Sequence, residues 1–414
     1  MKEIVRTIFV CIAFTVVLLG ASGFFGLPEA STWLVTADEN LQDCITRADD
    51  GDTVVLEEGV YEAVPTAFTD SLCGNCQEHE TPVEATVGFV IRGKGLVIIG
   101  RGPGKTVLKT NAGYGIFFDG SIVSVLKNVT ITGGRRDPDG MATDAAVVAR
   151  RSRVTVVGCD ISDNTSRIDT VVVGIGGVFG REGAELFISG NDIRNNGWDG
   201  IALYRGATAH ISDNVITEGR GAGIGITWDA VAVVYRNRIS DYWKGIGTFG
   251  DGRAVVRGNV VFDNLGWGII ATGTSFLDAS NNVVYHNGNC GVAVWSETCS
   301  VRFTNNIVAL NGWREEWVCP CVGVWVNGVN ESAEFSYNDV WGNKAGEYEG
   351  IEDQTGMNGN VSIDPRLPED GSFMLPGGSS LRDAGNPLLT DPDGTRSDMG
   401  IGDVLQRAAT RSSP

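Results

Sequence analysis

The stretch "NGWDGIALYRGATAHISDNVITEG" (residues 196–219) introduces a pattern that the chain then repeats. It returns as "RGAGIGITWDAVAVVYRNRISDYWKGIGTF" (220–249) and again as "NLGWGIIATGTSFLDASNNVVYHNGNCGVAVW" (264–295). Each copy holds an Asn before an apolar pair, a polar turn, a Gly followed by an apolar residue, and an alternating stretch typical of a β-strand. The pattern indicates one structural unit used many times.

The Asn positions give the length of that unit. Between Asn191 and Asn306 they recur in steps of 22 to 24 residues, and the outer steps of 31 or 32 residues carry an inserted loop. A unit this short cannot bury its apolar face alone, but stacked units pair each strand with its equivalent one coil away, about 4.8 Å distant. We therefore predict an all-β fold, a parallel β-helix, in which Asn occupies sharp corners because it tolerates left-handed backbone angles. The predicted corner series is Asn128, Asp160, Asn191, Asn214, Asn237, Asn259, Asn282, Asn306 and Asn338.

The organisation of the chain follows from its ends and interruptions. Residues 1–30 place Lys2 and Arg6 before an uncharged run, which predicts either a cleaved signal peptide or an uncleaved membrane anchor. Both alternatives put the remainder outside the cytoplasm, secreted or at the cell surface. Residues 31–343 are predicted to form the β-helix, with a Cys-containing insertion at 64–86. A helical cap is predicted at 37–52, with Leu41, Cys44, Ile45 and Ala48 on its apolar face. Residues 344–414, rich in Gly, Pro and Asp, are predicted to wrap over the last coil as an irregular cap.

Charge and cysteine content limit the partners and the compartment. A net charge of −19 argues against nucleic acid as a general partner, but not against an anionic substrate held in a locally basic groove. Eight cysteines lie beyond residue 30, and an oxidising compartment makes disulfides the default. Cys290 and Cys299 are the expected pair, and "CGNC" (73–76) and "CPC" (319–321) can each close a tight loop. Three histidines are too few to favour a zinc site, so no metal site is predicted.

Several stretches resemble a known group of proteins. "LQDCITRADDGDTVVLEEGVYEA" (41–63), "GLVIIGRGPGKTVLKT" (95–110), the Asn-Gly repeats and "LRDAGNPLLTDPDGTRSDMGIGD" (381–403) look like the secreted right-handed parallel β-helix proteins of the pectin-lyase-like superfamily. The resemblance implies the fold and an extracytoplasmic carbohydrate-active protein, but it spans lyases, hydrolases, epimerases and esterases. The Gly-His-Gly of the polygalacturonase-like members is absent, so no catalytic residue is carried over.

Candidate site residues were sought on the strand after each Gly-Ile. At its exit, Arg150, Arg181 and Arg205 align in successive coils and are followed by Trp228. Such a ladder suits carboxylates of an acidic polysaccharide, with pairing to local carboxylates as the alternative. At its start, Asp144 and Asp199 align two coils apart, about 10 Å, which is near the spacing used by inverting glycosidases. Lys244 lies two coils beyond Asp199.

Aromatic residues and two acidic turns complete the candidates. Trp198, Trp243 and Trp267 lie in turns where exposed indoles can stack on sugar rings. Both "DPDG" turns, at 137–140 and 391–394, leave calcium open as a cofactor, although neither continues as a complete calcium loop.

Two functions therefore stay open at the level of sequence. The first is an exported enzyme acting on a polysaccharide, with catalytic Asp144, Asp199, Arg181 and Arg205 and substrate-binding Arg150, Trp198, Trp228, Trp243, Lys244 and Trp267. Lyase or epimerase chemistry suits the Arg column, and hydrolysis suits the Asp pair. The second is a non-catalytic glycan-binding or structural cell-surface protein. The oligomeric state is not predicted.

Overall fold

The structure is a computed structural model that describes residues 30–74, 76–168, 171–315, 318–368 and 370–402. The chain divides into two compact units, Met1–Ala30 and Ser31–Pro414, and the second holds all the secondary structure described below. The predicted export segment lies outside the described residues apart from Ala30. Among the residues that are described, no helix is long and apolar enough to cross a membrane.

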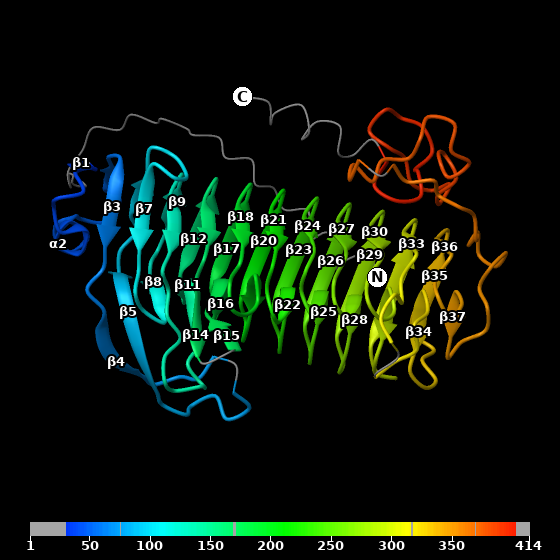
Figure 1. Cartoon of the computed structure of the whole chain (residues 1–414), viewed down its shortest axis with the longest axis horizontal. Helices are drawn as coiled ribbons and strands as arrows, with labels where there is room; N and C mark the ends of the chain where they lie inside the picture. The colour runs from blue at the N-terminus through cyan, green and yellow to red at the C-terminus, as the bar shows by residue number, and fades with distance from the viewer. Residues whose placement is uncertain (1–29, 75, 169–170, 316–317, 369, 403–414) are drawn as a thin grey trace, which may run out of the picture. The chain divides into compact units, whose positions relative to one another are not determined.

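Three long sheets run along the stack of coils (Figure 1). Sheet A contains β1 (Thr32–Val35), β2 (Thr53–Leu56), β6 (Val97–Ile99), β9 (Ser124–Lys127), β12 (Arg153–Val157), β17 (Glu185–Ser189), β20 (Thr208–Ser212), β23 (Val231–Tyr235), β26 (Arg253–Arg257), β29 (Phe276–Ser280), β32 (Ser300–Thr304) and β35 (Ala333–Ser336). Sheet B contains β3 (Gly59–Glu62), β7 (Thr106–Lys109), β10 (Thr130–Thr132), β13 (Asp160–Ser162), β18 (Asp192–Arg194), β21 (Val215–Thr217), β24 (Arg238–Ile239), β27 (Val260–Phe262), β30 (Val283–Tyr285), β33 (Ile307–Ala309) and β36 (Asp339–Trp341).

Sheet C is the third wall of the coils and carries the sites discussed below. It contains β4 (Thr66–Asp70), β5 (Val83–Arg92), β8 (Tyr114–Asp119), β11 (Ala145–Arg150), β16 (Gly176–Arg181), β19 (Ile201–Leu203), β22 (Ala222–Ile226), β25 (Lys244–Thr248), β28 (Trp267–Ala271), β31 (Val292–Val294), β34 (Val324–Val326) and β37 (Tyr348–Glu349). All neighbours pair in parallel except β4 and β5. A short antiparallel hairpin, β14 (Thr165–Ile168) and β15 (Val171–Gly174), forms a fourth sheet. The predicted right-handed parallel β-helix is confirmed.

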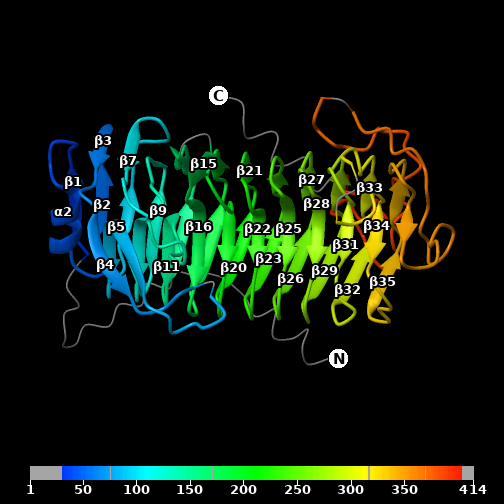
Figure 2. The ribbon, with the colours of Figure 1, turned by 60° about the horizontal axis from the view of Figure 1, so that its bottom comes forward.

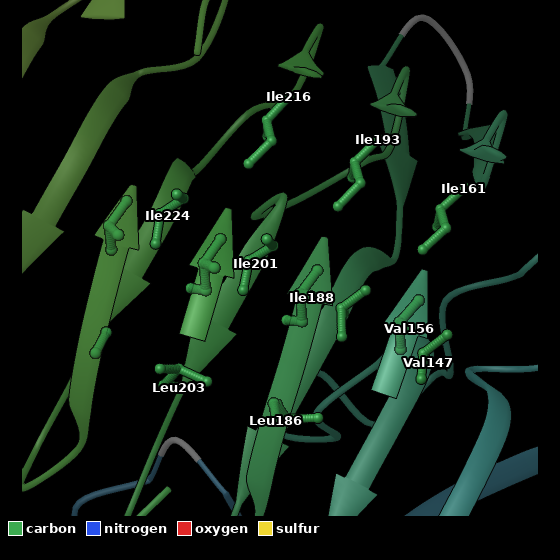
Figure 3. Close-up of a cluster of buried hydrophobic side chains, with 14 of the residues drawn as sticks. Val147, Val156, Ile161, Leu186, Ile188, Ile193, Ile201, Leu203, Ile216 and Ile224 are labelled. Carbon is green, nitrogen blue, oxygen red and sulfur yellow. The ribbon is translucent and has the colours of Figure 1, made fainter. Parts of the chain in front are cut away.

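The core is a column of branched apolar side chains, because each coil places the inward residues of its strands above those of the previous coil. Figure 3 shows Ile161, Ile193 and Ile216 from sheet B facing side chains of the other two walls. These residues are fully buried. Stacking of equivalent residues explains why the alternating pattern is repeated with so little variation.

A ladder of Asn side chains joins the coils at the corner between sheets A and B. The Nδ2 of each ladder Asn donates to Oδ1 of the next one at 2.9–3.0 Å, and the same oxygen accepts a backbone N–H. The structural role predicted for the series is therefore confirmed for its members from Asn191 to Asn338, whereas Asn128 is a left-handed turn residue outside the ladder. The ladder runs through Asn191, Asn214, Asn237, Asn259, Asn282, Asn306, Asn338 and Asn360.

Two details of the predicted series are wrong. The left-handed residue at this corner is the one before the ladder Asn, for example Asp213 (φ 58°) and Arg236 (φ 55°). In the earlier coil, the ladder position falls on Cys159, whose N–H donates to Asn191, and the predicted Asp160 lies one residue later. The carboxamide of the ladder Asn is thus needed for its hydrogen bonds, and the left-handed residue before it makes the turn.

A second Asn ladder, which the sequence analysis missed, lies at the corner between sheets B and C. Asn264, Asn287, Asn311 and Asn343 repeat the same donor–acceptor pattern, and Asn343 then donates to Glu347. These residues recur at the spacing of the first ladder, so the periodicity of a second Asn could have revealed them.

The two ends of the chain pack differently. Helix α2 (Leu41–Arg47) has Asn40 as its N-cap and buries Leu41, Cys44 and Ile45, as predicted; Figure 1 shows it beside β1. The C-terminal segment is irregular, also as predicted, but Phe373, Leu381 and the apolar residues around them do not wrap over the last coil. They pack beside the coils against β27, β30 and β33 of sheet B.

The insertion forms the antiparallel strand β4 and a loop, residues 71–82, that lies along sheet C (Figure 2). Cys73 and Cys76 are within bonding distance in this loop, with Cα atoms 5.4 Å apart. The expected Cys290–Cys299 pair is not formed, because Cys299 lies beside Ser275 while the Sγ of Cys290 is 3.1 Å from that of Cys319.

Breaking one rung of the first ladder tests its contribution to stability. Asn237→Ala removes the acceptor of the Asn214 amide and of its backbone N–H, as well as the donor to Asn259. Because these buried groups lose their partners, we expect the free energy of unfolding to fall by about 2–4 kcal/mol. Urea unfolding measures the change. The exposed Asn327→Ala is the control and should cost less than about 1 kcal/mol; equal effects of the two variants would contradict the role of the ladder.

Candidate functional site

Two residues of the predicted arginine ladder, Arg150 and Arg181, are buried. Arg150 and Arg181 are register partners on β11 and β16, and both guanidinium groups bind the carboxylate of Asp70 at the end of β4. Asp119 binds Arg150 at 2.9 Å, and the side chain of Arg181 has no exposed surface. Taking two guanidinium groups out of water requires paired charges, which the insertion supplies.

Arg150 and Arg181 pair with carboxylates of the protein itself, which was the alternative to binding a polysaccharide. Glu182, one of the carboxylates weighed from sequence, lies 3.3 Å from Arg181, but the main partner Asp70 comes from more than a hundred residues earlier. We therefore leave Arg150 and Arg181 out of the candidate site.

Strand register corrects the two predicted columns by one residue. Arg181 aligns with Tyr204, because Gly180 pairs with Leu203, and Arg205 follows in the turn with Glu182 as its neighbour. Likewise, Gly176 pairs with Ala145 and not with Asp144. In both cases a turn residue was counted as part of a strand.

Arg205 and Trp228 line an open hollow of about 600 Å³ at the exit end of the sheet C strands, together with His79 and Glu182. The Arg205 guanidinium lies 4.8 Å from the Trp228 ring centre and donates to the carbonyl of Cys76. Both residues have left-handed backbones, φ 42° and 61°, which is uncommon for bulky side chains. The predicted catalytic role of Arg205 and the predicted substrate-binding role of Trp228 are compatible with this position and stay predictions.

Asp144 lies at the opposite, amino end of the strands in a small hollow of about 60 Å³. The hollow is also lined by Arg136, Phe179 and Trp198, and Trp198 is 44% exposed with the Arg136 guanidinium 5.9 Å from its ring centre. This places a carboxyl group at the base of a hollow with an accessible indole wall.

Burial raises the pKa of Asp144 to about 8, and the nearby Asp137 carboxylate adds to the rise. Asp137 is held by the N–H and hydroxyl of Thr86, at 2.8 and 2.6 Å. Its own N–H donates to Oδ2 of Asp144 at 2.8 Å. Asp144 is therefore protonated at neutral pH. The predicted turn "DPDG" contributes Asp137 to this pair, a role that sequence analysis did not foresee.

Asp199 lies at the same end of the strands two coils further on. Its surroundings are mostly protein although part of its surface stays accessible, and burial raises its pKa to about 6. The N–H of Ala222 donates to Oδ1 at 2.6 Å, which partly offsets the rise. A Cβ at Gly221 would overlap the Asp199 carboxylate, so this glycine admits the carboxylate to the backbone of the next coil.

Lys244 shares a column with Asp199, as predicted. Lys244 pairs in register with Ala222, and Ala222 lies between the two charged residues. Burial lowers the pKa of Lys244, and the charge of Asp199 opposes that shift. Among the contacts of the described residues no ion pair joins them. A carboxylate and an ammonium group therefore face the outside of sheet C with a small residue between them.

Trp243 and Trp267 belong to a cluster of four indoles. Trp243, Trp267, Trp295 and Trp325 meet edge to face, with ring centres 5.9, 5.6 and 5.1 Å apart in sequence. Trp267 is 5% exposed and the other three are partly exposed. The expected exposure of Trp267 in a turn is therefore wrong, because it is the first residue of β28.

Carboxylates of the two acidic turns accept hydrogen bonds from nearby backbone N–H groups. Asp139 accepts backbone N–H groups of Glu84 and Met141, and Asp393 accepts that of Thr395. Among the described residues no group of three or more His, Cys, Asp or Glu side chains is arranged to hold a metal ion. A requirement for calcium stays an untested prediction.

The family can now be stated. Residues 105–226 and 176–340 match the family described as "Right handed beta helix region". These ranges span more than half of the chain, which therefore belongs to the right-handed β-helix family. The sequence matches none of the curated proteins with which it was compared.

Solved structures resemble the chain at low identity. The periplasmic alginate epimerase AlgG matches with TM-score 0.48 and 13% identity, covering 80% of this chain and 82% of its own. Pectate lyase Pel9A matches with TM-score 0.48 and 15% identity, covering 91% and 97%. The A-module of the mannuronan C-5 epimerase AlgE4 of Azotobacter vinelandii matches with TM-score 0.46 and 15% identity, covering 78% and 94%. Neither activity nor substrate is taken from these likenesses.

The raised pKa of Asp144 has a consequence for stability. Between about pH 4 and pH 8 the folded state keeps a proton that the unfolded chain releases, so stability falls as pH rises through this range. Asp144→Asn stays neutral and can still donate to Asp137. We therefore expect unchanged stability near pH 4 and, near pH 9, a variant more stable than the wild type by on the order of a few kcal/mol.

Denaturant unfolding at several pH values measures this difference. The exposed Asp49→Asn is the control and should follow the wild type throughout. If Asp144→Asn loses as much stability as the wild type when the pH is raised, Asp144 is not the group that holds the proton.

Proposed function

We propose that this is an exported carbohydrate-active protein that cleaves a polysaccharide on the outer face of sheet C. The observation that carries the proposal is the pair of carboxyl groups with pKa values on either side of neutrality, about 8 for Asp144 and about 6 for Asp199. At pH 7 the first is an acid that can protonate a leaving oxygen and the second is a base that can activate water.

The placement of the two carboxyls supports this division of roles. They lie at the amino ends of β11 and β19, which are separated by one strand, so their backbones are about 10 Å apart. Inverting glycosidases hold their two carboxyl groups about 6.5–9.5 Å apart to seat a water, a separation that side chains on backbones about 10 Å apart can reach. Trp198, adjacent to Asp199 in sequence, shares a hollow with Asp144 and offers an aromatic face to a sugar ring.

Export rests on residues 1–30, whose basic start and apolar run are typical of a signal, and on the Cys73–Cys76 geometry in the insertion. Mass spectrometry of the protein recovered from outside the producing cells tests whether the chain is exported. A chain found only inside the cells would contradict this part of the proposal.

A second chemistry is favoured by Lys244. A lowered pKa on Lys244 next to Asp199 suits abstraction of the proton beside a uronate carboxylate, with one group as base and the other neutralising the carboxylate. This would make the protein a lyase or an epimerase of acidic polysaccharides. Arg150 and Arg181 are held in buried ion pairs and cannot bind a uronate carboxylate. The lyase or epimerase chemistry therefore has less support, and hydrolysis is our first choice.

The deciding experiment incubates the purified full chain with a panel of neutral and acidic polysaccharides, with and without calcium. New reducing ends without ultraviolet absorbance of unsaturated products support hydrolysis. Asp144→Asn and Asp199→Asn should each lower kcat by at least about 100-fold, because each removes one proton-transfer step. Asp192→Asn, a carboxyl of sheet B whose pKa is also raised, is the matched control and should keep full activity.

Other products identify other chemistries. Unsaturated products abolished by Lys244→Met would establish the lyase, and a changed uronate composition without cleavage would establish the epimerase. Retention of a glycan without any product would support the non-catalytic glycan-binding alternative, for which the accessible Trp198 is the supporting observation. If no polysaccharide of the panel gives a product or is retained, the proposal is overturned.

The pH profile gives an independent check. If Asp199 acts as base and Asp144 as acid, kcat/KM should rise through about pH 6 and fall through about pH 8. A profile with no limb in the range from about pH 5 to 9 would contradict the assignment of both residues.

A further inference from the structure

The four indoles on the outside of sheet C have no part in the proposed acid–base pair. Trp243, Trp267, Trp295 and Trp325 belong to successive coils, at or next to β25, β28, β31 and β34. With Phe249 they surround the buried residues Ile270, Ala293 and Val322. Trp243, Phe249, Trp295 and Trp325 keep part of their surface accessible. The cluster therefore forms an aromatic strip along the axis of the β-helix.

The strip is continuous with the proposed site. Lys244 pairs in register with Trp267, and its Nζ lies 5.8 Å from the ring centre of Phe249. In the other direction along sheet C, the insertion lies against the face, where the carbonyls of Leu72 and Cys76 accept hydrogen bonds from Arg181 and Arg205. A long ligand that reaches Asp199 and Lys244 is thereby directed toward the indoles.

Cations gather at this strip although the protein is strongly acidic. The Arg314 guanidinium lies 5.1 Å from the ring centre of Trp243, and the exposed Lys344 donates to the carbonyl of Arg314. Lys244 adds a third positive group. The strip ends at Trp325, because its register partner on the last strand is the carboxylate residue Glu349.

We propose that the strip from Trp243 to Trp325 binds the continuation of an acidic polysaccharide chain that occupies the site at Asp199 and Lys244. Indole faces stack on the apolar faces of sugar rings, and the flanking Lys244 and Arg314 pair with carboxylates along the chain. Three inter-coil steps give the strip a length of about 14 Å, enough for a few sugar units. This inference rests on the proposed function, since it extends the same binding face.

The test measures binding and does not require turnover. Affinity electrophoresis of the full chain is carried out in gels containing polygalacturonate, with dextran as the neutral comparison. Trp295→Leu and Trp325→Leu keep an apolar side chain but remove the ring, so each should raise Kd roughly 3- to 10-fold. The loss should be larger for long oligouronates than for a dimer. Phe187→Ala, an exposed aromatic of sheet A, is the control and should bind like the wild type.

Variants that bind polygalacturonate as tightly as the wild type would overturn the inference, as would equal binding of dextran. A concentration-dependent dimer that the Trp variants lose would instead assign the strip to a second copy of this chain and also overturn it. Unfolding temperatures check the fold. If Trp325→Leu does not fold, Trp325→Phe replaces it and should weaken binding by a smaller factor.

Failure of this inference is distinguishable from failure of the proposed function. Ring-dependent binding without any product would keep the strip and remove the acid–base pair. Cleavage that depends on Asp144 and Asp199, with binding unaffected by the Trp variants, would keep the pair and remove the strip.

Discussion

The Asn ladder is the constraint on which the rest of the structure depends. A buried carboxamide must satisfy two donors and an acceptor, and each interior Asn of the ladder does so through a backbone carbonyl of the previous coil and the Asn residues at the same corner of the coils on either side. The length of each coil is thereby fixed, and insertions are confined to turns outside the ladder. Because the coils cannot slip, every other residue falls into a column with a defined neighbour about 4.8 Å away.

Equivalent positions of successive coils bring side chains of the same type together, which can stabilise or destabilise the fold. Stacked isoleucines build the core, whereas the indoles of the strip on sheet C come from different columns and meet edge to face. Stacked arginines repel one another, and Arg150 and Arg181 are stable only because Asp70 and Asp119 neutralise them. The insertion that carries Asp70 is therefore part of the fold, since without it two buried cations would lack their main partner.

The repetition predicted the fold well and the site less well, for physical reasons. Periodicity is visible in one dimension, so the β-helix, the Asn corner and the helical face of Leu41, Cys44 and Ile45 followed from the sequence alone. The column containing Asp199 and Lys244 also followed from it. Register at the turns did not, because the arginine pattern aligned Arg205 with Arg181, whereas strand pairing aligns the turn residue Arg205 with Glu182.

Long-range contacts were also invisible in the periodicity. The partner of Arg181 is Asp70, 111 residues away, and no repeat connects them. Trp295 and Trp325 were not recognised as site candidates, because they lie on different columns and meet only through the size of their rings. The hydrogen-bonded position of Asp137 likewise depends on Thr86, which belongs to an earlier coil.

The same stacking explains how a repetitive wall can hold two carboxyl groups of different acidity. Where the neighbouring coil has glycine, a carboxyl group can approach its backbone, and Gly113 and Gly221 leave such room beside Asp144 and Asp199. Burial raises both pKa values, but the neighbours differ: Asp144 faces another carboxylate, whereas Asp199 faces an N–H and the ammonium group of Lys244. The first environment retains a proton and the second releases it more readily. A difference of one side chain between coils thus produces an acid and a base from the same residue type on the same wall.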